Sequence, residues 1–268
     1  MGVYDGYYLY CDLDGTLLDE EKRVSAENYT AIRSFVEQGG HFGVATGRVP
    51  LILGSVEHHM PINAPCILYN GAGLYDLTAG EFLARHAISP ALAAEAAACV
   101  ISAKGNACVQ IFTDSAIYEV NPNQRADPQT AIEQIPVISS SIDQISGTVL
   151  KLLISHLPDE LNEIQAAVEK AGFAERFTLV RTSSTYLEFV ASGVSKGAAL
   201  SDVRARCGNV KKILAIGDYN NDLEMVSLAD IGGAPANAID EVKSAADIVL
   251  TADHNHSCVA RFLEVALS

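Results

Sequence analysis

The chain has 268 residues, of which 49% are hydrophobic, and a formal net charge of −15 from 18 basic and 33 acidic side chains. This length suffices for one large domain or two moderate ones, and the hydrophobic content supports a well-buried core. So acidic a chain is a poor electrostatic partner for nucleic acid or anionic membranes, and no apolar run approaches the roughly 20 residues that cross a bilayer.

The first predicted element is a strand over residues 7–11, a run of five apolar or aromatic residues without polar alternation. Asp12 and Asp14 follow where this strand should end, and Gly15 and Thr16 come next. The carboxyl ends of parallel strands are where open α/β sheets place their chemistry. Two carboxylates this close repel each other, so they need a cation, and Mg²⁺ prefers oxygen ligands. A solvated Asp-Gly turn is the structural alternative.

Alternating helices and strands are predicted up to about residue 82. Ser25 is the expected N-cap of a helix over 26–38, and a strand over 42–45 precedes Thr46. Next come a helix opened by Pro50 and a strand over 66–69 that runs into Asn70-Gly71. This order of strand, helix and strand predicts a parallel sheet.

The pattern changes near Phe82. Ser89-Pro90 opens an alanine-rich helix, and a second helix is predicted between Pro158 and Gly172. Strand-like runs surround these helices, at 108–112, 116–120, 148–155 and 178–190. Adjacent strands with segregated helices indicate an α+β unit.

From Ser195 the parallel pattern returns. The predicted elements are a helix over 196–206, a strand over 213–216, a helix from Asp222, and strands near Ile231 and Ile248. Lys196 falls in the first turn of its helix, where a cation opposes the macrodipole, so we expect a fixed anion nearby. An exposed lysine is the alternative interpretation.

Four short motifs occur in order along the chain. They are Asp12-Leu13-Asp14-Gly15-Thr16, then Thr46, then Lys196, and then Gly217-Asp218 with Asn221-Asp222. Together they resemble the haloacid dehalogenase (HAD) superfamily of phosphohydrolases. The long insertion between the second and third motifs is similar to the Cof-type branch, subclass IIB. The matching segments span roughly half of the chain.

This resemblance implies an α/β fold in two parts. A Rossmann-like core with a doubly wound parallel sheet would occupy residues 1–82 and 189–268. An α+β cap would be inserted over 83–188 and would select the substrate, with specificity in loops such as 121–127.

The resemblance also implies a chemical role for the carboxylates. Asp12 would attack phosphorus and give an aspartyl phosphate. Asp14 would protonate the leaving oxygen and then take a proton from water, which requires a protonated carboxyl at the moment of attack. The Mg²⁺ ligands would be Asp12, Asp14 through its backbone carbonyl, and Asp218. Asp222 would orient Lys196 or the waters of the metal.

The resemblance also implies which residues would bind phosphate. The resemblance assigns this role to Thr46, Gly47, Arg48, Lys196 and Asn221. Several of these residues have structural alternatives. Thr46 suits a turn, Arg48 suits a carboxylate as well as a phosphate, and both Asn221 and Asp222 suit a helix cap. Asn70-Gly71 either shapes the pocket or forms an ordinary turn.

The expected activity is hydrolysis of a small phosphorylated metabolite, a sugar phosphate or a nucleotide-type phosphate. A sugar phosphomutase of the same superfamily and a noncatalytic phosphate-binding module are the alternatives. Asp14 and Asp218 favour an enzyme, because binding alone needs no proton donor. No nucleic acid or membrane partner is expected, and the sequence leaves monomer and homodimer open.

Other sequence features predict the cellular location of the protein and argue against a structural zinc site. The amino terminus lacks the basic region of an export signal, and the six cysteines form no C-x-x-C pair, so reduced thiols and a cytoplasmic setting are expected. The pairs His58-His59 and His254/His256 lack the spacing of a structural zinc site. Ser257-Cys258 stand where the resembling family has glycine, which puts the turn conformation there in question.

Overall fold

The computed structural model describes residues 2–53, 60–121 and 136–268. The chain forms two compact units, Met1–Ala84 with Ser195–Ser268, and Arg85–Val194. The boundaries expected from the sequence, 82/83 and 188/189, fall inside two strands, β5 (Glu81–Arg85) and β11 (Tyr186–Ala191). In the structure the units divide between Ala84 and Arg85, one residue before the end of β5, and between Val194 and Ser195, beyond the end of β11.

The first unit is built on a five-stranded sheet in the order β14-β13-β12-β1-β2. All of its pairings are parallel, which confirms the predicted parallel sheet. The strands are β1 (Tyr7–Cys11), β2 (His41–Val44), β12 (Lys212–Ile216), β13 (Ile231–Ala234) and β14 (Ile248–Val249). In the centre, Cys11 pairs with Ile216 on one side and Val44 on the other. Strand β1, which precedes Asp12, and strand β12, which precedes Asp218, therefore end side by side.

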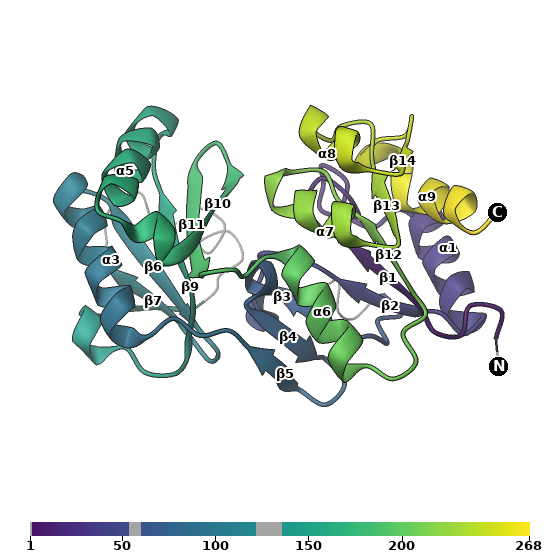
Figure 1. The fold of residues 1–268 in the computed structure, drawn as a ribbon, viewed down its shortest axis with the longest axis horizontal. Helices are drawn as coiled ribbons and strands as arrows, with labels where there is room; N and C mark the ends of the chain where they lie inside the picture. Colours follow the sequence, from purple (N-terminus) through teal and green to yellow (C-terminus); the bar gives the residue numbers. More distant parts are fainter. Residues whose placement is uncertain (1, 54–59, 122–135) are drawn as a thin grey trace. The chain divides into compact units, whose positions relative to one another are not determined.

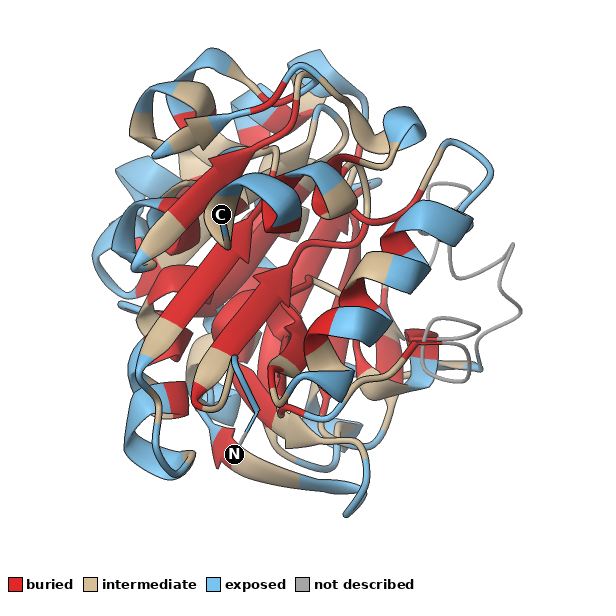
Figure 2. Cartoon of the chain, turned by 90° about the vertical axis from the view of Figure 1, so that its right-hand side faces the viewer, coloured by how far each residue is buried: buried red, intermediate tan, exposed pale blue. Residues whose placement is uncertain are grey.

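Helices cover both faces of this sheet (Figure 1). They are α1 (Ala26–Glu37), α6 (Lys196–Arg206), α7 (Leu223–Leu228), α8 (Asp240–Ala245) and α9 (Cys258–Ala266). Tyr8, Tyr10 and Ile213 pack in one apolar cluster with residues of α6 and α7. Successive strand residues point to opposite faces of the sheet. Helix α1 contacts α9 and β2, and α9 also contacts β12. Figure 2 shows the buried strands between helices that expose their outer sides.

A three-stranded sheet extends the first unit, with the order β3-β4-β5. Its strands β3 (Cys66–Leu68) and β4 (Gly73–Asp76) are antiparallel, and β3 lies beside β2 through a bridge between Ala45 and Ile67. The β4–β5 pair was not among the predicted strands. Pro50 opens a short 3₁₀ turn, η1 (Pro50–Ile52). Residues 54–59, which include His58-His59 and any continuation of the predicted helix, lie outside the described residues.

The second unit is a six-stranded sheet with helices on one face, which is the predicted α+β arrangement. Its order is β10-β11-β9-β6-β7-β8. The elements are α3 (Pro90–Ala103), β6 (Cys108–Thr113), β7 (Ile117–Val120), β8 (Val137–Ser139), β9 (Val149–Ser155), α5 (Pro158–Lys170) and β10 (Phe177–Ser183), with β11 as above. The run predicted as strand over 178–190 is a hairpin of β10 and β11. Most of the predicted specificity loop 121–127 lies outside the described residues.

Two further observations bear on the setting of the protein. None of the described helices has both the length and the apolar composition to cross a membrane. All six cysteines carry free thiols. Four of them are buried, as small hydrophobic side chains usually are: Cys11, Cys66, Cys108 and Cys258.

Candidate active site

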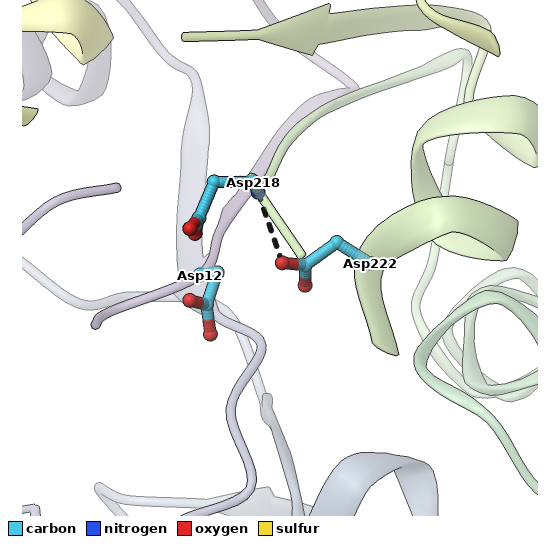
Figure 3. A group of neighbouring side chains, drawn as sticks. All are labelled: Asp12, Asp218 and Asp222. Carbon is cyan, nitrogen blue, oxygen red and sulfur yellow. Dashed lines mark hydrogen bonds between the residues drawn. The ribbon is translucent and has the colours of Figure 1, made fainter. Parts of the chain in front are cut away.

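Three carboxylates from the two chain segments of the first unit lie together at the carboxyl end of the sheet. Asp12 follows β1 directly, and Asp218 follows the neighbouring β12 after one glycine. Asp222 lies in a 3₁₀ turn, η5 (Asn220–Asp222), just before α7. Each of the three offers an oxygen, and these oxygens lie within 4.8 Å of one another (Figure 3). The parallel pairing of β1 with β12 causes this convergence.

Lys196 is buried between two of these carboxylates. It is the first residue of α6, and none of its surface is exposed to solvent. Its Nζ lies 2.7 Å from Asp12 Oδ1 and 2.6 Å from Asp222 Oδ1. Burial alone would lower the pKa of Lys196, but the charges of Asp12 and Asp222 raise the pKa above its ordinary value. The fixed anion expected near this helix terminus is therefore a pair of aspartates.

Asp222 organises the turn that follows β12. Its Oδ2 accepts hydrogen bonds from the backbone N–H of Asp218 at 3.0 Å and of Tyr219 at 3.1 Å, while Oδ1 accepts from Lys196. Both oxygens are thus engaged by the protein. A Cβ at Gly217 would overlap the Asp222 side chain, so only glycine allows this approach. The geometry favours the positioning role expected for Asp222 over a place among the metal ligands.

Asp218 has an environment that disfavours a negative charge. Burial, and then the charge of Asp222, raise the pKa of Asp218 to about 7, although Thr16 Oγ1 donates a hydrogen bond to its Oδ1 at 2.8 Å. Burial also raises the pKa of Asp12 well above its usual range, against the opposing charge of Lys196. Three aspartates thus face one lysine. An additional hard cation with oxygen ligands, such as Mg²⁺, fits this donor set and charge.

Two residues of the first motif contribute contacts that were not assigned to them from the sequence. Thr16 holds Asp218 through the bond just described. Gly15 has a φ of +85°, and a Cβ there would lie 2.5 Å from Asp218 Oδ2. Their signal in the sequence was their place directly after Asp14 in the same motif. The motif therefore shapes the position of the second metal-ligand candidate as well as the first.

Asp14 lies apart from the group of three carboxylates and is held by two cations. Arg48 donates from Nε to Oδ2 at 3.0 Å and from Nη2 to Oδ1 at 2.9 Å. Lys22 donates from Nζ to Oδ1 at 2.7 Å. Burial opposes the charge of Asp14, yet the bonds from Arg48 and Lys22 lower its pKa. Both cations thus stabilise the ionised form of Asp14, and the proton transfer expected of Asp14 stays a prediction.

The second motif is a turn that places Arg48. Thr46 is buried, and its Oγ1 accepts the backbone N–H of Arg48 at 3.2 Å. The Arg48 side chain is 11% exposed and pairs with Asp14. Of the two partners considered for Arg48, this structure shows the carboxylate. Gly47 passes close to Asn70, whose side chain would be 3.1 Å from a Cβ at that position.

Asn70 connects the third strand to the last motif. It has a φ of 55° and is buried, and its Oδ1 accepts a hydrogen bond from Asn221 Nδ2 at 3.1 Å. Asparagine tolerates this left-handed conformation better than most residues do. Asn70 therefore does more than form an ordinary turn, because it holds the side chain of Asn221.

The chain does adopt a glycine-like conformation at Ser257. Its φ is 56°, in the left-handed region, and its Oγ lies 2.8 Å from Ser25 Oγ. The Cys258 thiol donates to the Thr16 carbonyl at 3.1 Å. His256 pairs with Asp253 on an exposed turn, in line with the interpretation of this run as a loop.

Comparison with known proteins identifies the family. A family model for haloacid dehalogenase-like hydrolases matches residues 9–263. The 5-amino-6-(5-phospho-D-ribitylamino)uracil phosphatase YwtE of Bacillus subtilis is 28% identical over 285 residues, covering 96% of each chain. The pyridoxal phosphate phosphatase YbhA of Escherichia coli is 25% identical over 264 residues, covering 94% of this chain and 95% of that protein.

Solved structures share the fold. A HAD/COF-like hydrolase of Plasmodium vivax superposes with a TM-score of 0.84 at 25% identity, over 99% of this chain and 96% of the other. The family model spans both segments of the first unit and the whole of the second. The chain therefore belongs to the haloacid dehalogenase-like hydrolases, in their Cof-type branch.

Proposed function

We propose that this protein is a Mg²⁺-dependent phosphatase that hydrolyses a small phosphorylated metabolite through an aspartyl phosphate on Asp12. The observation that carries the proposal is the group of Asp12, Asp218 and Asp222, with Lys196 between Asp12 and Asp222. A nucleophilic carboxylate needs positive charge beside it to approach a phosphate dianion, and Lys196 supplies one such charge. Binding of phosphate by a helix N-terminus would add to it at α6.

Asp12, Asp218 and the backbone carbonyl of Asp14 would hold the metal ion. When bound, Mg²⁺ would supply charge neutralisation of the phosphoryl oxygens and of the aspartates. Lys196 fixes one oxygen of Asp12 at 2.7 Å and thereby limits the orientations of the carboxylate. Asp222 in turn fixes Lys196, since its other oxygen is tied to the backbone.

The reaction would proceed in two steps. An Asp12 oxygen forms a bond to phosphorus while the ester P–O bond breaks, and Asp14 gives a proton to the leaving oxygen. Water then attacks the phosphorus of the aspartyl phosphate, Asp14 takes a proton from it, and Asp12 and inorganic phosphate are regenerated. Thr46, Gly47, Arg48 and Asn221 are the remaining candidates for contacts to the transferred phosphoryl group.

A small substrate agrees with the charge of the chain. The net charge of −15 repels polyanions at long range, so nucleic acids are disfavoured. The relatives YwtE and YbhA act on a ribitylaminouracil phosphate and on pyridoxal phosphate, both small phosphate esters. The free thiols fit a cytoplasmic location. The role of the second unit as a specificity cap stays a prediction.

Phosphate release from a panel of sugar phosphates and nucleotides, with Mg²⁺ and with a chelator, tests the proposal. Asp12→Asn should abolish phosphate release without unfolding the protein. The matched control Asp240→Asn, at an exposed helix position, should leave phosphate release unchanged. Undiminished activity of the Asp12 variant would contradict the nucleophile assignment. Turnover that requires a sugar bisphosphate would identify a mutase, and ligand binding without release would identify a binding module.

A further inference from the structure

The turn after strand β3 holds three consecutive residues in the left-handed region of backbone conformation. This turn, η2 (Tyr69–Gly71), has φ values of 53° at Tyr69, 55° at Asn70 and 101° at Gly71. Glycine adopts such values readily and asparagine tolerates them, but for a bulky residue such as tyrosine they are unfavourable. Strained conformations of this kind persist where the surrounding structure enforces them, and they are concentrated at functional sites.

Two backbone hydrogen bonds join η2 to the second motif. The N–H of Tyr69 donates to the Arg48 carbonyl and the N–H of Asn70 donates to the Thr46 carbonyl, both at 3.1 Å. Tyr69 and Asn70 are each 1% exposed, so water has little access to compete for these bonds. The strained turn and the loop that carries the phosphate-binding candidates Thr46 and Arg48 are therefore held together.

The glycine of η2 lies against the start of helix α6. A Cβ at Gly71 would overlap the carbonyl oxygen of Ser195, and this close approach together with the positive φ requires glycine. Ser195 is the N-cap of α6, since its Oγ accepts the backbone N–H of Ala198 at 2.8 Å, and Lys196 is the first residue of the helix. The turn therefore packs beside the residue that precedes Lys196.

The side chain of Asn70 reaches the fourth motif. Its Oδ1 accepts a hydrogen bond from Nδ2 of Asn221 at 3.1 Å. Asn221 lies in η5, directly before Asp222. An amide nitrogen carries two hydrogens, so the bond to Asn70 leaves the second hydrogen of Asn221 Nδ2 for another acceptor. One candidate for phosphate binding is thus oriented by a residue outside the four motifs.

We propose that Asn70 is a positioning residue for phosphate binding: it holds the Asn221 amide so that the second N–H of Nδ2 donates to the phosphoryl group. The inference rests on the proposed phosphatase function. The oxygens of a phosphate dianion accept hydrogen bonds, so a donor must face them. A half-turn of the Asn221 amide would set its oxygen against Asn70 Oδ1, so Asn70 disfavours that orientation. Without Asn70, the Asn221 side chain loses more rotational freedom when phosphate binds.

The test uses a substitution that removes the side chain of Asn70 and keeps the conformation of the backbone. Asn70→Gly deletes the acceptor and adopts the left-handed conformation without strain. Asn209→Gly is the matched control, because Asn209 also has a φ of 55°, and its Nδ2 donates to Asp5 at an exposed position. Asn221→Ala and the double variant with Asn70→Gly complete a double-mutant cycle, which measures whether the two side chains act together.

Each variant is assayed as the full chain for phosphate release from one phosphate ester with Mg²⁺, and for inhibition by inorganic phosphate. Asn70→Gly should raise KM and the inhibition constant of phosphate by roughly 2- to 10-fold, the range of one hydrogen bond, with kcat within about twofold of the wild type. Asn221→Ala should raise both constants at least as much. In the Asn221→Ala background, Asn70→Gly should change neither constant further, and Asn209→Gly should behave as the wild type.

Three kinetic results would overturn the proposal. One is an unchanged KM in Asn70→Gly, including a fall in kcat alone, which is what a loss of correctly folded enzyme would give. Another is an equal effect of Asn70→Gly with and without the Asn221 side chain, because Asn70 would then act separately from Asn221. The last is the same rise in KM for Asn209→Gly, since the effect would then belong to any left-handed asparagine.

Binding of inorganic phosphate separates this inference from the proposed function. If the wild-type chain releases no phosphate from a panel of esters, the phosphatase assignment fails, and calorimetric titration with inorganic phosphate and Mg²⁺ decides on Asn70. Asn70→Gly should then raise the Kd of phosphate by roughly 2- to 10-fold, and this difference should vanish in the Asn221→Ala background. Equal Kd values for Asn70→Gly and the wild type, or no binding to the wild type, would refute the positioning role.

Discussion

Replacing Asp222 with asparagine hardly changes the shape of the side chain, but it should strongly destabilise the first unit. Asp222 is fully buried, and it holds Lys196 at 2.6 Å while accepting two backbone N–H groups. The asparagine oxygen can keep the backbone bonds, but its NH₂ group then faces the Lys196 ammonium. Lys196 keeps only Asp12 as a partner.

Breaking a buried ion pair by removing one partner costs about 3–5 kcal/mol. The lower end applies here, since Asp12 still compensates Lys196, so we expect a loss of about 3 kcal/mol in the free energy of unfolding. For a chain of this size this corresponds to roughly 6–12 °C in Tm. An exposed pair offers the contrast: Glu37→Gln, which removes the partner of Arg33, should cost less than about 1 kcal/mol.

The two compact units can unfold separately, so the assay must report on the first unit alone. Amide hydrogen exchange in α6 does so, because the protection of its amides measures the local free energy of opening. The experiment is done without Mg²⁺ for Asp222→Asn, Glu37→Gln and the wild type. If Asp222→Asn loses no more protection than Glu37→Gln, the buried ion pair contributes little and the reasoning fails.

Three further outcomes are expected. Mg²⁺ at a hundred times its Kd should stabilise the folded protein by about 2.7 kcal/mol, and Asp218→Asn should abolish most of this shift in thermal denaturation. Ser257→Gly should be more stable than Ser257→Ala by about 1 kcal/mol in urea denaturation. Both variants lose the hydrogen bond to Ser25, and only alanine keeps the strain of the left-handed backbone, so equal stabilities would refute this strain. Gly217→Ala should lower the free energy of unfolding by roughly 1–3 kcal/mol, since its Cβ overlaps Asp222, and an unchanged Tm would show that the turn adapts.

Local sequence determined the strands that carry the site. The apolar run over Tyr7–Cys11 and the one ending at Ile216 are buried, and they are too short for a helix, which favours strands. Parallel strands align their carboxyl ends, so Asp12 and Asp218 could be expected near each other. The start of α1 was predicted as well, because Ser25 caps this helix through its own side chain.

The partners of individual side chains were decided only by the tertiary structure. Arg48 suits a phosphate or a carboxylate, and the structure pairs it with Asp14 beside a turn in which Thr46 accepts the Arg48 backbone N–H. Lys22, from a separate loop, donates to the same carboxylate. Likewise, the hold of Asp222 on Lys196 joins two helices that are separate in sequence. Periodicity and turn signals act over a few residues, whereas the ionisation of a buried carboxylate depends on charges brought close by the whole fold.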